Sequence, residues 1–299
     1  MAYRIGSFNC LNFGLGESKD VQKIVDIINE ENFDIVALQE LKGKKALDRL
    51  LKYMSSSKWD GIADDTVNDY AFIWNKNRIK LAETNYKERI KKYEPRIYKQ
   101  YKIDRKLGQT DLKREPYYAR FYPIGGGSPF IEIRIINCHI RFSKNANEEF
   151  DFGAIALRRN EFDVLTKAIY SKEADKRYGD NRPAYTIMLG DYNLNSPSSQ
   201  AVGAYLIESF EMQDNGIVKR IVTKQNELTT LKKQIEESGN NYANNYDHFT
   251  FDENRFADVA MEFSKVDAVN KYSDGDFEAY SKTVSDHVPI LMELKIKKG

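Results

Sequence analysis

The sequence predicts an α/β protein in which two β-sheets pack face to face, with helices outside, in one domain. Short apolar runs rich in β-branched and aromatic residues recur along the whole chain, and helical periods separate several of them. Some runs are apolar at every position, which is typical of strands covered on both faces. With 41% hydrophobic residues in 299, the chain has enough apolar material for a large core.

The predicted strands are nine apolar runs bounded by polar or turn-forming residues. Residues 131–135 alternate between isoleucine and charged side chains, as in a sheet with one buried face, whereas residues 35–38 are apolar throughout. The nine ranges are Tyr3–Asn9, Asp34–Gln39, Tyr70–Trp74, Ile79–Ala82, Tyr117–Tyr122, Phe130–Cys138, Ala184–Leu189, Tyr246–Phe251 and Val288–Ile296.

Three helices are predicted between these strands. Ser18 can cap the first, whose apolar residues between Val21 and Ile28 recur at helical spacing. The second runs from about Lys44 to Tyr53, and the third from about Ala154 to Lys176. The Lys/Glu/Asn-rich residues 215–245 are predicted to form a polar insertion with at most a short helix. Because no repeat and no Pro- or Gly-rich linker divides the chain, residues 1–299 are expected to form a single domain.

The termini and cysteines bear on the cellular compartment. No apolar run approaches the roughly 18 residues that a transmembrane helix needs. The first ten residues lack the basic start and apolar stretch of a secretory signal. Cys10 and Cys138 both lie in apolar runs and are expected to be buried free thiols in a reducing compartment. The sequence therefore predicts a cytoplasmic protein that does not enter a membrane.

The charge distribution is uneven although the net charge is only +1. Residues 76–114 hold 14 Lys or Arg against 5 Asp or Glu, a net charge of +9, with four tyrosines interspersed. Clustered cations with aromatic residues are typical of surfaces that bind a phosphate backbone. A solvated basic surface would give the same composition, so both interpretations stay open at this point.

Polar residues follow several predicted strands, where loops on a rigid scaffold often carry function. Asn9 ends the first strand, Glu40 follows the second, and His139 follows the run that ends at Cys138. A carboxylate at the end of an apolar strand either turns into solvent or meets a cation. A single histidine at a strand end is more often structural than catalytic. None of the three is decisive alone.

Two further polar clusters complete the set. Asp191 and Asn193 follow the strand that ends at Leu189, and alternation could place both on one face. An ordinary turn would also explain them. Asp286 and His287 precede the last strand, and neighbouring Asp and His residues can orient an imidazole or bind a metal. Each cluster is again weak by itself.

Taken together and in this order, the five clusters resemble the endonuclease/exonuclease/phosphatase superfamily from about Tyr3 to Ile296. The resemblance implies a four-layer α/β sandwich with two central mixed sheets flanked by helices. It also adds Asp247, which matches the family's carboxylate beside its catalytic histidine. Chance agreement at six ordered positions is improbable.

Within the superfamily, the chain is most similar to the deoxyribonuclease I branch. Arg114 opens an Arg-Glu-Pro segment that resembles the one whose arginine contacts DNA phosphate in that branch, and His139 also fits. One feature departs from the pattern. The carboxylate that partners this histidine in the branch falls at Asn68 by alignment, so either Asp69 has taken over or His139 lacks a partner.

The resemblance implies a Mg²⁺-dependent phosphodiesterase, with Mn²⁺ a plausible substitute. Glu40, Asn9 and Asp286 are expected to bind the metal; the expected catalytic residues are His139, Asp191, Asn193, Asp247 and His287, and Arg114 and Asn193 are expected to bind substrate. The expected substrate is nucleic acid, most readily double-stranded DNA, cleaved internally; no protein partner can be deduced. A phosphatase or phosphodiesterase acting on inositol phosphates or a lipid head group is the alternative, and a catalytically inactive binding protein is a third possibility.

Overall fold

Two mixed β-sheets form the centre of the computed structural model, which describes residues 1–64, 68–86, 89–92, 96–99, 101–105, 108–142, 154–178, 182–214, 216–237 and 239–296. The first sheet, sheet A, has the strand order β17-β18-β1-β2-β4-β3, with β1 and β2 parallel and the other pairs antiparallel. Its strands are β1 (Ala2–Phe13), β2 (Ile35–Leu41), β3 (Trp59–Ala63), β4 (Ala71–Asn75), β17 (Val259–Lys265) and β18 (Ile290–Ile296).

Sheet B has the order β14-β15-β16-β13-β12-β11-β5, with β8 also paired to β11 and a parallel pair at β12 and β13. Its strands are β5 (Ile79–Leu81), β8 (Arg96–Ile97), β11 (Tyr117–Pro123), β12 (Glu132–His139), β13 (Ala184–Asp191), β14 (Ser209–Asp214), β15 (Ile217–Lys224) and β16 (Asp247–Asp252). Two short hairpins, β6–β7 (Glu83–Tyr86, Arg89–Lys92) and β9–β10 (Lys102–Arg105, Gly108–Asp111), lie outside both sheets.

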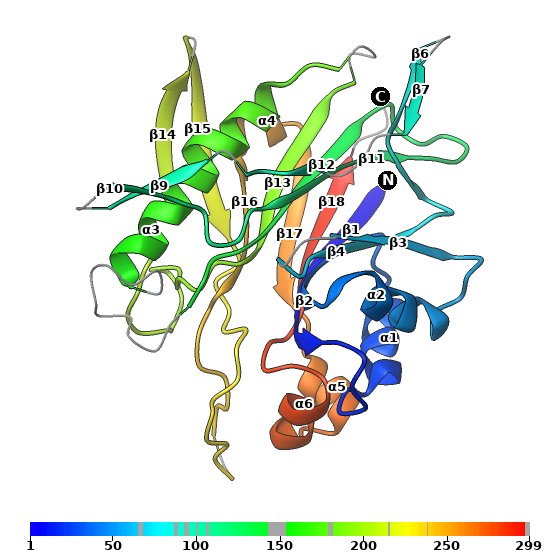
Figure 1. Cartoon of the computed structure of the whole chain (residues 1–299), viewed down its shortest axis with the longest axis vertical. Helices are drawn as coiled ribbons and strands as arrows, with labels where there is room; N and C mark the ends of the chain where they lie inside the picture. The colour runs from blue at the N-terminus through cyan, green and yellow to red at the C-terminus, as the bar shows by residue number, and fades with distance from the viewer. Residues whose placement is uncertain are drawn as a thin grey trace.

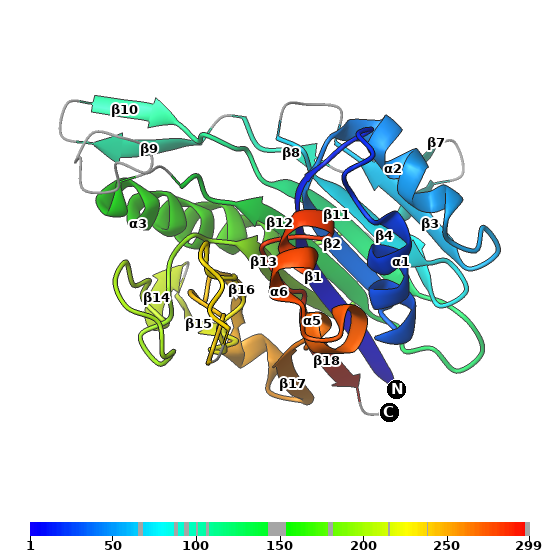
Figure 2. The ribbon, with the colours of Figure 1, turned by 90° about the horizontal axis from the view of Figure 1, so that it is seen from below.

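Helices cover the outer face of each sheet, which makes four layers (Figures 1 and 2). Helices α1 (Val21–Glu30), α2 (Gly43–Lys52), α5 (Ala268–Ser273) and α6 (Phe277–Thr283) share a core with sheet A. The α3 (Ile155–Asp163), η1 (Val164–Tyr170) and α4 (Ser171–Asp175) segments share another core with sheet B. A further short helix, η2 (Glu253–Phe256), follows β16. The predicted four-layer sandwich is therefore confirmed.

Alternation along the strands assigns each side chain to a layer. In β1, Ile5 packs between the two sheets and Phe8 packs under the helices. In β12, Ile135 packs between the sheets and Ile136 under α3 and η1. Covering on both faces explains the continuously apolar runs in the sequence. In β12 the expectation of a single buried face over residues 131–135 was wrong, because Glu132 and Arg134 are also buried and pair with each other at 2.9 Å.

All nine predicted strands overlap observed strands, and all three predicted helices are present. Two details of the prediction were wrong. Asp20, not Ser18, caps α1 by accepting a hydrogen bond from the Lys23 backbone N–H at 3.1 Å. The polar insertion does not begin at residue 215, because Ile217–Lys224 forms β15 between β14 and β16. No helix occurs in the described part of residues 225–245.

The sequence prediction also missed several elements. β14 and β17 are half-exposed edge strands, and α5 and α6 are short helices, so none carries a long apolar pattern. None of the described helices is long and apolar enough to cross a lipid bilayer. Both termini lie at the same end of sheet A, where Ala2 pairs with Lys295 (Figure 1).

Candidate active site

The predicted site residues meet at one end of the space between the two sheets. Every second side chain of these strands points into the core between the sheets. Asn9 is the next such position on β1, and His139, Asp191 and Asp247 are such positions on β12, β13 and β16. The three sheet B residues stand side by side, because His139 pairs with Asp191 and Asp191 pairs with Asp247. The same alternation that builds the apolar core therefore places polar side chains together where that core ends.

A hydrogen-bond network joins the sheets directly below the site. The Gln39 amide nitrogen donates to Asn137 Oδ1 at 2.7 Å and to Ser7 Oγ at 3.1 Å. Asn137 Nδ2 donates back across the sandwich to the carbonyl of Leu38 at 3.0 Å. All these groups are buried, so their mutual bonding fixes the relative position of the two strand ends.

Glu40 reaches the site only because its backbone departs from strand geometry. Alternation would point its side chain towards the helices, but its φ of +56° lies in the left-handed region. Its Oε1 lies 3.4 Å from Asn9 Nδ2, and its Oε2 accepts from the Asn12 backbone N–H at 3.0 Å. A strained non-glycine residue that aims a carboxylate into a polar cluster is a common feature of functional sites.

His287 is held between two carboxylates. Its Nδ1 lies 2.8 Å from Asp247 Oδ2, and its Nε2 lies 3.6 Å from Asp191 Oδ2. Its backbone N–H donates to Ser285 Oγ, which itself donates to the Asn9 carbonyl at 2.6 Å. His287 is thus tied to both sheets, and its outer ring nitrogen faces Asp191.

His139 faces the same carboxylate from the other side. Its Nε2 lies 3.4 Å from Asp191 Oδ2 and 3.9 Å from Glu40 Oε1, and its backbone N–H donates to Tyr70 Oη at 2.8 Å. Its Nδ1 is buried and has no hydrogen-bond partner among the described residues. Neither Asn68 nor Asp69 therefore supplies the partner that the deoxyribonuclease I branch would have there.

The two histidines lie in opposite electrostatic environments, which shift their pKa values in opposite directions. Burial lowers the pKa of His139 well below its usual value, and the nearby cations Arg114 and His287 lower it further. Burial alone would also lower the pKa of His287, but Asp247 and Asp191 together hold that pKa well above the usual value. Burial raises the pKa of Asp191. The site thus shifts the pKa values of two imidazoles in opposite directions beside a shared carboxyl group.

Asn193 lies behind Asp191 with a left-handed φ of +49°. Its backbone N–H donates to Asp191 Oδ1 at 2.9 Å, and its side-chain nitrogen donates to the carbonyl of Ile140 at 2.8 Å. Arg158 of α3 donates to the Asn193 carbonyl and is buried to 1% exposure. The sequence prediction missed Arg158. Phe162 and Leu165 follow it by four and seven residues, which places all three on the buried face of the helix. An arginine on such a face is unusual and could have been noticed.

Arg114 lies near His139, Asp69 and Glu161, and its positive charge lowers the pKa of each. Its Nη1 is buried without a hydrogen-bond partner among the described residues. Two other cations of the 76–114 stretch are paired with acids, Arg78 with Asp34 and Arg96 with Glu173. Several more lie outside the described residues. Arg114 is therefore the described cation of this stretch that the structure brings to the site.

The oxygen groups at the site fit a magnesium ion. Glu40 is partly exposed, and Asp286 Oδ1 is buried without a hydrogen-bond partner among the described residues. Within that part of the chain, no three His, Cys, Asp or Glu side chains are grouped to hold a metal by themselves. Mg²⁺ commonly binds through one or two carboxylates and several waters, so the carboxylates of Glu40 and Asp286 are ligands of the right type and number.

Comparison with solved structures shows the same fold. The TDP2 protein of D. rerio (humanized by 14 mutations) is 15% identical, with 98% of this chain and 99% of that chain covered and a TM-score of 0.56. ANGEL2, a 2′,3′-cyclic phosphatase solved with adenosine-2′,3′-vanadate, is 13% identical with a TM-score of 0.58, covering 99% and 96%. An endonuclease/exonuclease/phosphatase family protein of Bacteroides thetaiotaomicron is 13% identical with a TM-score of 0.55, covering 99% and 98%.

These identities establish the fold alone, and no curated protein sequence matches the chain. The sequence model of the Endonuclease/Exonuclease/phosphatase family matches residues 6–287. That range includes Asn9, Glu40, His139, Asp191 and His287. The chain therefore belongs to the endonuclease/exonuclease/phosphatase family.

Proposed function

We propose that this protein is a Mg²⁺-dependent endonuclease that hydrolyses phosphodiester bonds in DNA. The observation that carries the proposal is the convergence of Asn9, Glu40 and His287 from the sheet A side with His139 and Asp191 of sheet B. Family membership supports a hydrolase of this general type. A TDP2 structure contains a single-stranded DNA product, which favours a nucleic acid substrate for this chain.

In the proposed reaction, Asp191 accepts the proton of the attacking water. His287, held by Asp247, orients that water. His139 and Asn193 donate to the non-bridging oxygens. The Asn193 amide can do so because one of its two N–H groups remains after the bond to Ile140. The anionic phosphate favours the charged form of His139, which then takes up a proton from solvent and passes it to the leaving oxygen. Mg²⁺ held by Glu40, Asn9 and Asp286 would neutralise charge developing on the phosphoryl oxygens.

Arg114 supplies the substrate contact that favours nucleic acid in this proposal. Its buried Nη1 lacks a partner beside His139, so a phosphate oxygen would satisfy an otherwise unbonded donor. An arginine pairs well with phosphate because its planar donors match two oxygens. The protein would therefore bind the substrate phosphate with Arg114 on the sheet B side.

A panel of substrates tests the proposal. Supercoiled plasmid, linear duplex, single-stranded DNA, RNA, sphingomyelin and inositol phosphates are each incubated with Mg²⁺ or Mn²⁺, with and without EDTA. We expect nicking of plasmid that EDTA abolishes. Turnover of the lipid or inositol phosphate in place of DNA would instead favour the phosphatase alternative, and metal-dependent turnover of none would indicate a binding protein.

The Glu40→Gln variant tests the assigned site within the same panel. We expect it to be nearly inactive at limiting Mg²⁺ while its melting temperature stays close to wild type, because the metal loses a charged oxygen but the shape is kept. Glu278→Gln is the matched control, since Glu278 is 66% exposed on α6. Full activity of Glu40→Gln would refute its assignment as a metal ligand.

A further inference from the structure

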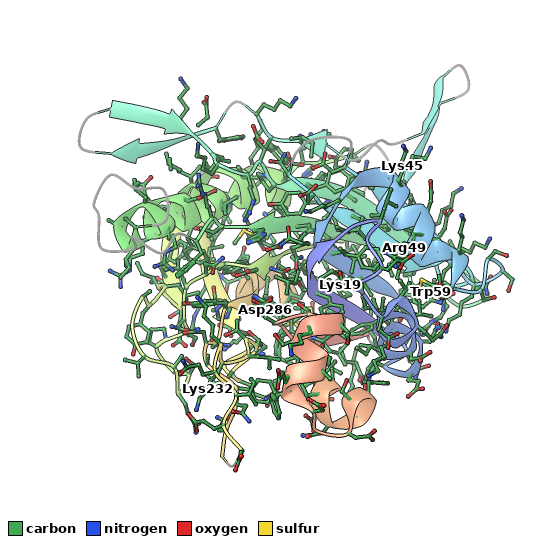
Figure 3. The ribbon with its side chains drawn as sticks, turned by 60° about the horizontal axis from the view of Figure 1, so that its bottom comes forward. Lys19, Lys45, Arg49, Trp59, Lys232 and Asp286 are labelled. Carbon is green, nitrogen blue, oxygen red and sulfur yellow. The ribbon has the colours of Figure 1, made fainter. Side chains whose placement is uncertain are left out.

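A second group of cations lies beside the site on the sheet A side, outside the basic 76–114 stretch. It consists of Lys19, in the loop before α1, and Lys45 and Arg49 of α2; we call these three residues the α2 rim. In Figure 3 their side chains follow one another across this face towards Asp286. The Lys19 ammonium lies close enough to Asp286 and Glu40 to be affected by both charges.

The α2 rim is held in place by backbone carbonyls rather than by acids. Arg49 donates to the carbonyls of Gly14 and Gly16 at 2.8 and 2.6 Å, which ties α2 to the loop that carries Lys19. Lys19 Nζ donates to the carbonyl of Val284 at 2.8 Å, two residues before Asp286. Both contacts fix the cations without neutralising them.

Within the described part of the chain, the α2 rim has no ion-pair partner. Among the described residues, no carboxylate oxygen lies within the ion-pair distance of 4.0 Å of the charged nitrogens of Lys19, Lys45 or Arg49. Arg78 and Arg96 of the 76–114 stretch do have such partners. Three unneutralised cations on a fixed surface form an electrostatic site for an anion.

The geometry of α2 fits a chain of phosphates better than one phosphate. Lys45 and Arg49 are four residues apart on one helix face, which places them about 6 Å apart along the axis. Phosphates follow one another about every 3.4 Å of axis along one strand of DNA. Arg114 precedes β11 of sheet B, so a strand bound at the site could contact cations that come from both sheets.

We infer that the α2 rim binds the phosphates of a polynucleotide strand next to the cleaved bond. This inference rests on the proposed function and extends it: the substrate must continue beyond the scissile phosphate on the α2 side. A dinucleotide or a small phosphate diester would reach the metal residues but not Lys45. The α2 rim therefore selects long substrates over short ones.

Lys45→Ala and Lys45→Glu test the inference, with Lys44→Ala as the matched control. Both lysines are exposed in the first turns of α2, but Lys44 points about 100° away around the helix, next to Asp48. Alanine favours the helix, so the variants should fold. Binding of an oligonucleotide of about 16 nucleotides, alone and as a duplex, is measured in Ca²⁺ over a salt series. The ratio of kcat/KM for that oligonucleotide to kcat/KM for a dinucleotide is measured in Mg²⁺.

We expect the log-log salt slope of Lys45→Ala to flatten by about 0.9 for duplex or about 0.7 for single strand, the value for one phosphate contact. We expect the oligonucleotide-to-dinucleotide ratio of Lys45→Glu to fall roughly tenfold, the equivalent of about 1.4 kcal/mol. Lys44→Ala should match wild type in both. Equal slopes for Lys44→Ala and Lys45→Ala, or no change in either, would overturn the inference while leaving wild-type cleavage, and hence the proposed function, intact.

Failure of the proposed function would look different, because wild type would then cleave neither the oligonucleotide nor the dinucleotide. A parallel arm measures sedimentation with phosphatidylserine vesicles. If Lys45→Ala loses vesicle binding and keeps its DNA salt slope, the α2 rim binds a membrane surface and the inference is wrong.

Discussion

Two residues at the candidate site owe their position to an unusual local conformation or environment. Glu40 is turned into the site by its left-handed backbone, and His139 is buried with an unbonded Nδ1. Each arrangement is unfavourable in isolation, since strain and an unsatisfied buried nitrogen both oppose folding. A metal bound by Glu40 can offset the strain at that residue, which is consistent with a binding role.

The three histidines should differ in importance. His139→Ala and His287→Ala should each lower kcat by about 10²- to 10⁴-fold, the usual loss for a positioned acid or base. His248 lies on the other face of β16, and its ring nitrogens contact the carbonyls of Leu194 and Gln225, so His248→Ala should affect stability more than kcat. Rate measurements with melting curves check this. A His248→Ala variant as inactive as His287→Ala, at an unchanged melting temperature, would contradict the assignment.

Glu161 should make stability depend on pH. Burial raises its pKa to about 8, although Arg114 opposes the rise; the unperturbed value is about 4.3. Folding therefore disfavours the ionised form, so stability is unaffected below about pH 4 and falls as pH rises towards about 8. At roughly 1.4 kcal/mol per pKa unit, the loss is of the order of a few kcal/mol.

Glu161→Gln removes this dependence because glutamine does not ionise. Its advantage in free energy of unfolding over wild type should grow between about pH 5 and pH 8 and then level off. Urea denaturation at several pH values measures it. A constant difference across that range would show that Glu161 is already ionised in the folded protein.

At the scale of elements, the close approach of β12 and β13 depends on Gly190. Its φ is +140°, and an added Cβ would lie 1.8 Å from the Cys138 carbonyl oxygen. The neighbouring pairs place His139 beside Asp191, so this contact sets the spacing of two site residues.

Gly190→Ala should therefore lower the free energy of unfolding by about 3 kcal/mol or more, from strain and overpacking together. Gly126→Ala is the control, because nothing lies within 4 Å of its added Cβ. Chemical denaturation of both variants provides the measurement. Similar stabilities for the two would mean that β12 and β13 can separate without penalty.

At the scale of the whole molecule, the two sheets are expected to unfold as one unit. The inter-sheet core and the Gln39–Asn137 hydrogen bond join them, and each sheet carries one buried thiol. Burial raises the pKa of Cys10 to about 12 and that of Cys138 well above its usual value. Only the thiolate reacts rapidly, so both thiols should be inert in the folded protein.

Alkylation with iodoacetamide over a urea series, followed by mass spectrometry, tests whether residues 1–299 behave as a single domain. We expect both cysteines to become reactive at the same urea concentration, as in two-state unfolding. Reaction of one cysteine well before the other would indicate that the two sheets open separately.

The sequence by itself determined the fold class, the nine central strands and the ordered set from Asn9 to His287, because alternation, apolar runs and strand-end polar residues are local signals. It could not show that Arg78 and Arg96 are neutralised by Asp34 and Glu173, since those acids lie far away in the chain. Nor could it show that Glu40 turns inward or that His139 lacks a partner. The α2 rim likewise exists only because Arg49 reaches across to the Gly14–Gly16 loop. Backbone strain, pairing of distant charges and the meeting of two sheets are properties of the packed chain, so only the tertiary structure decided them.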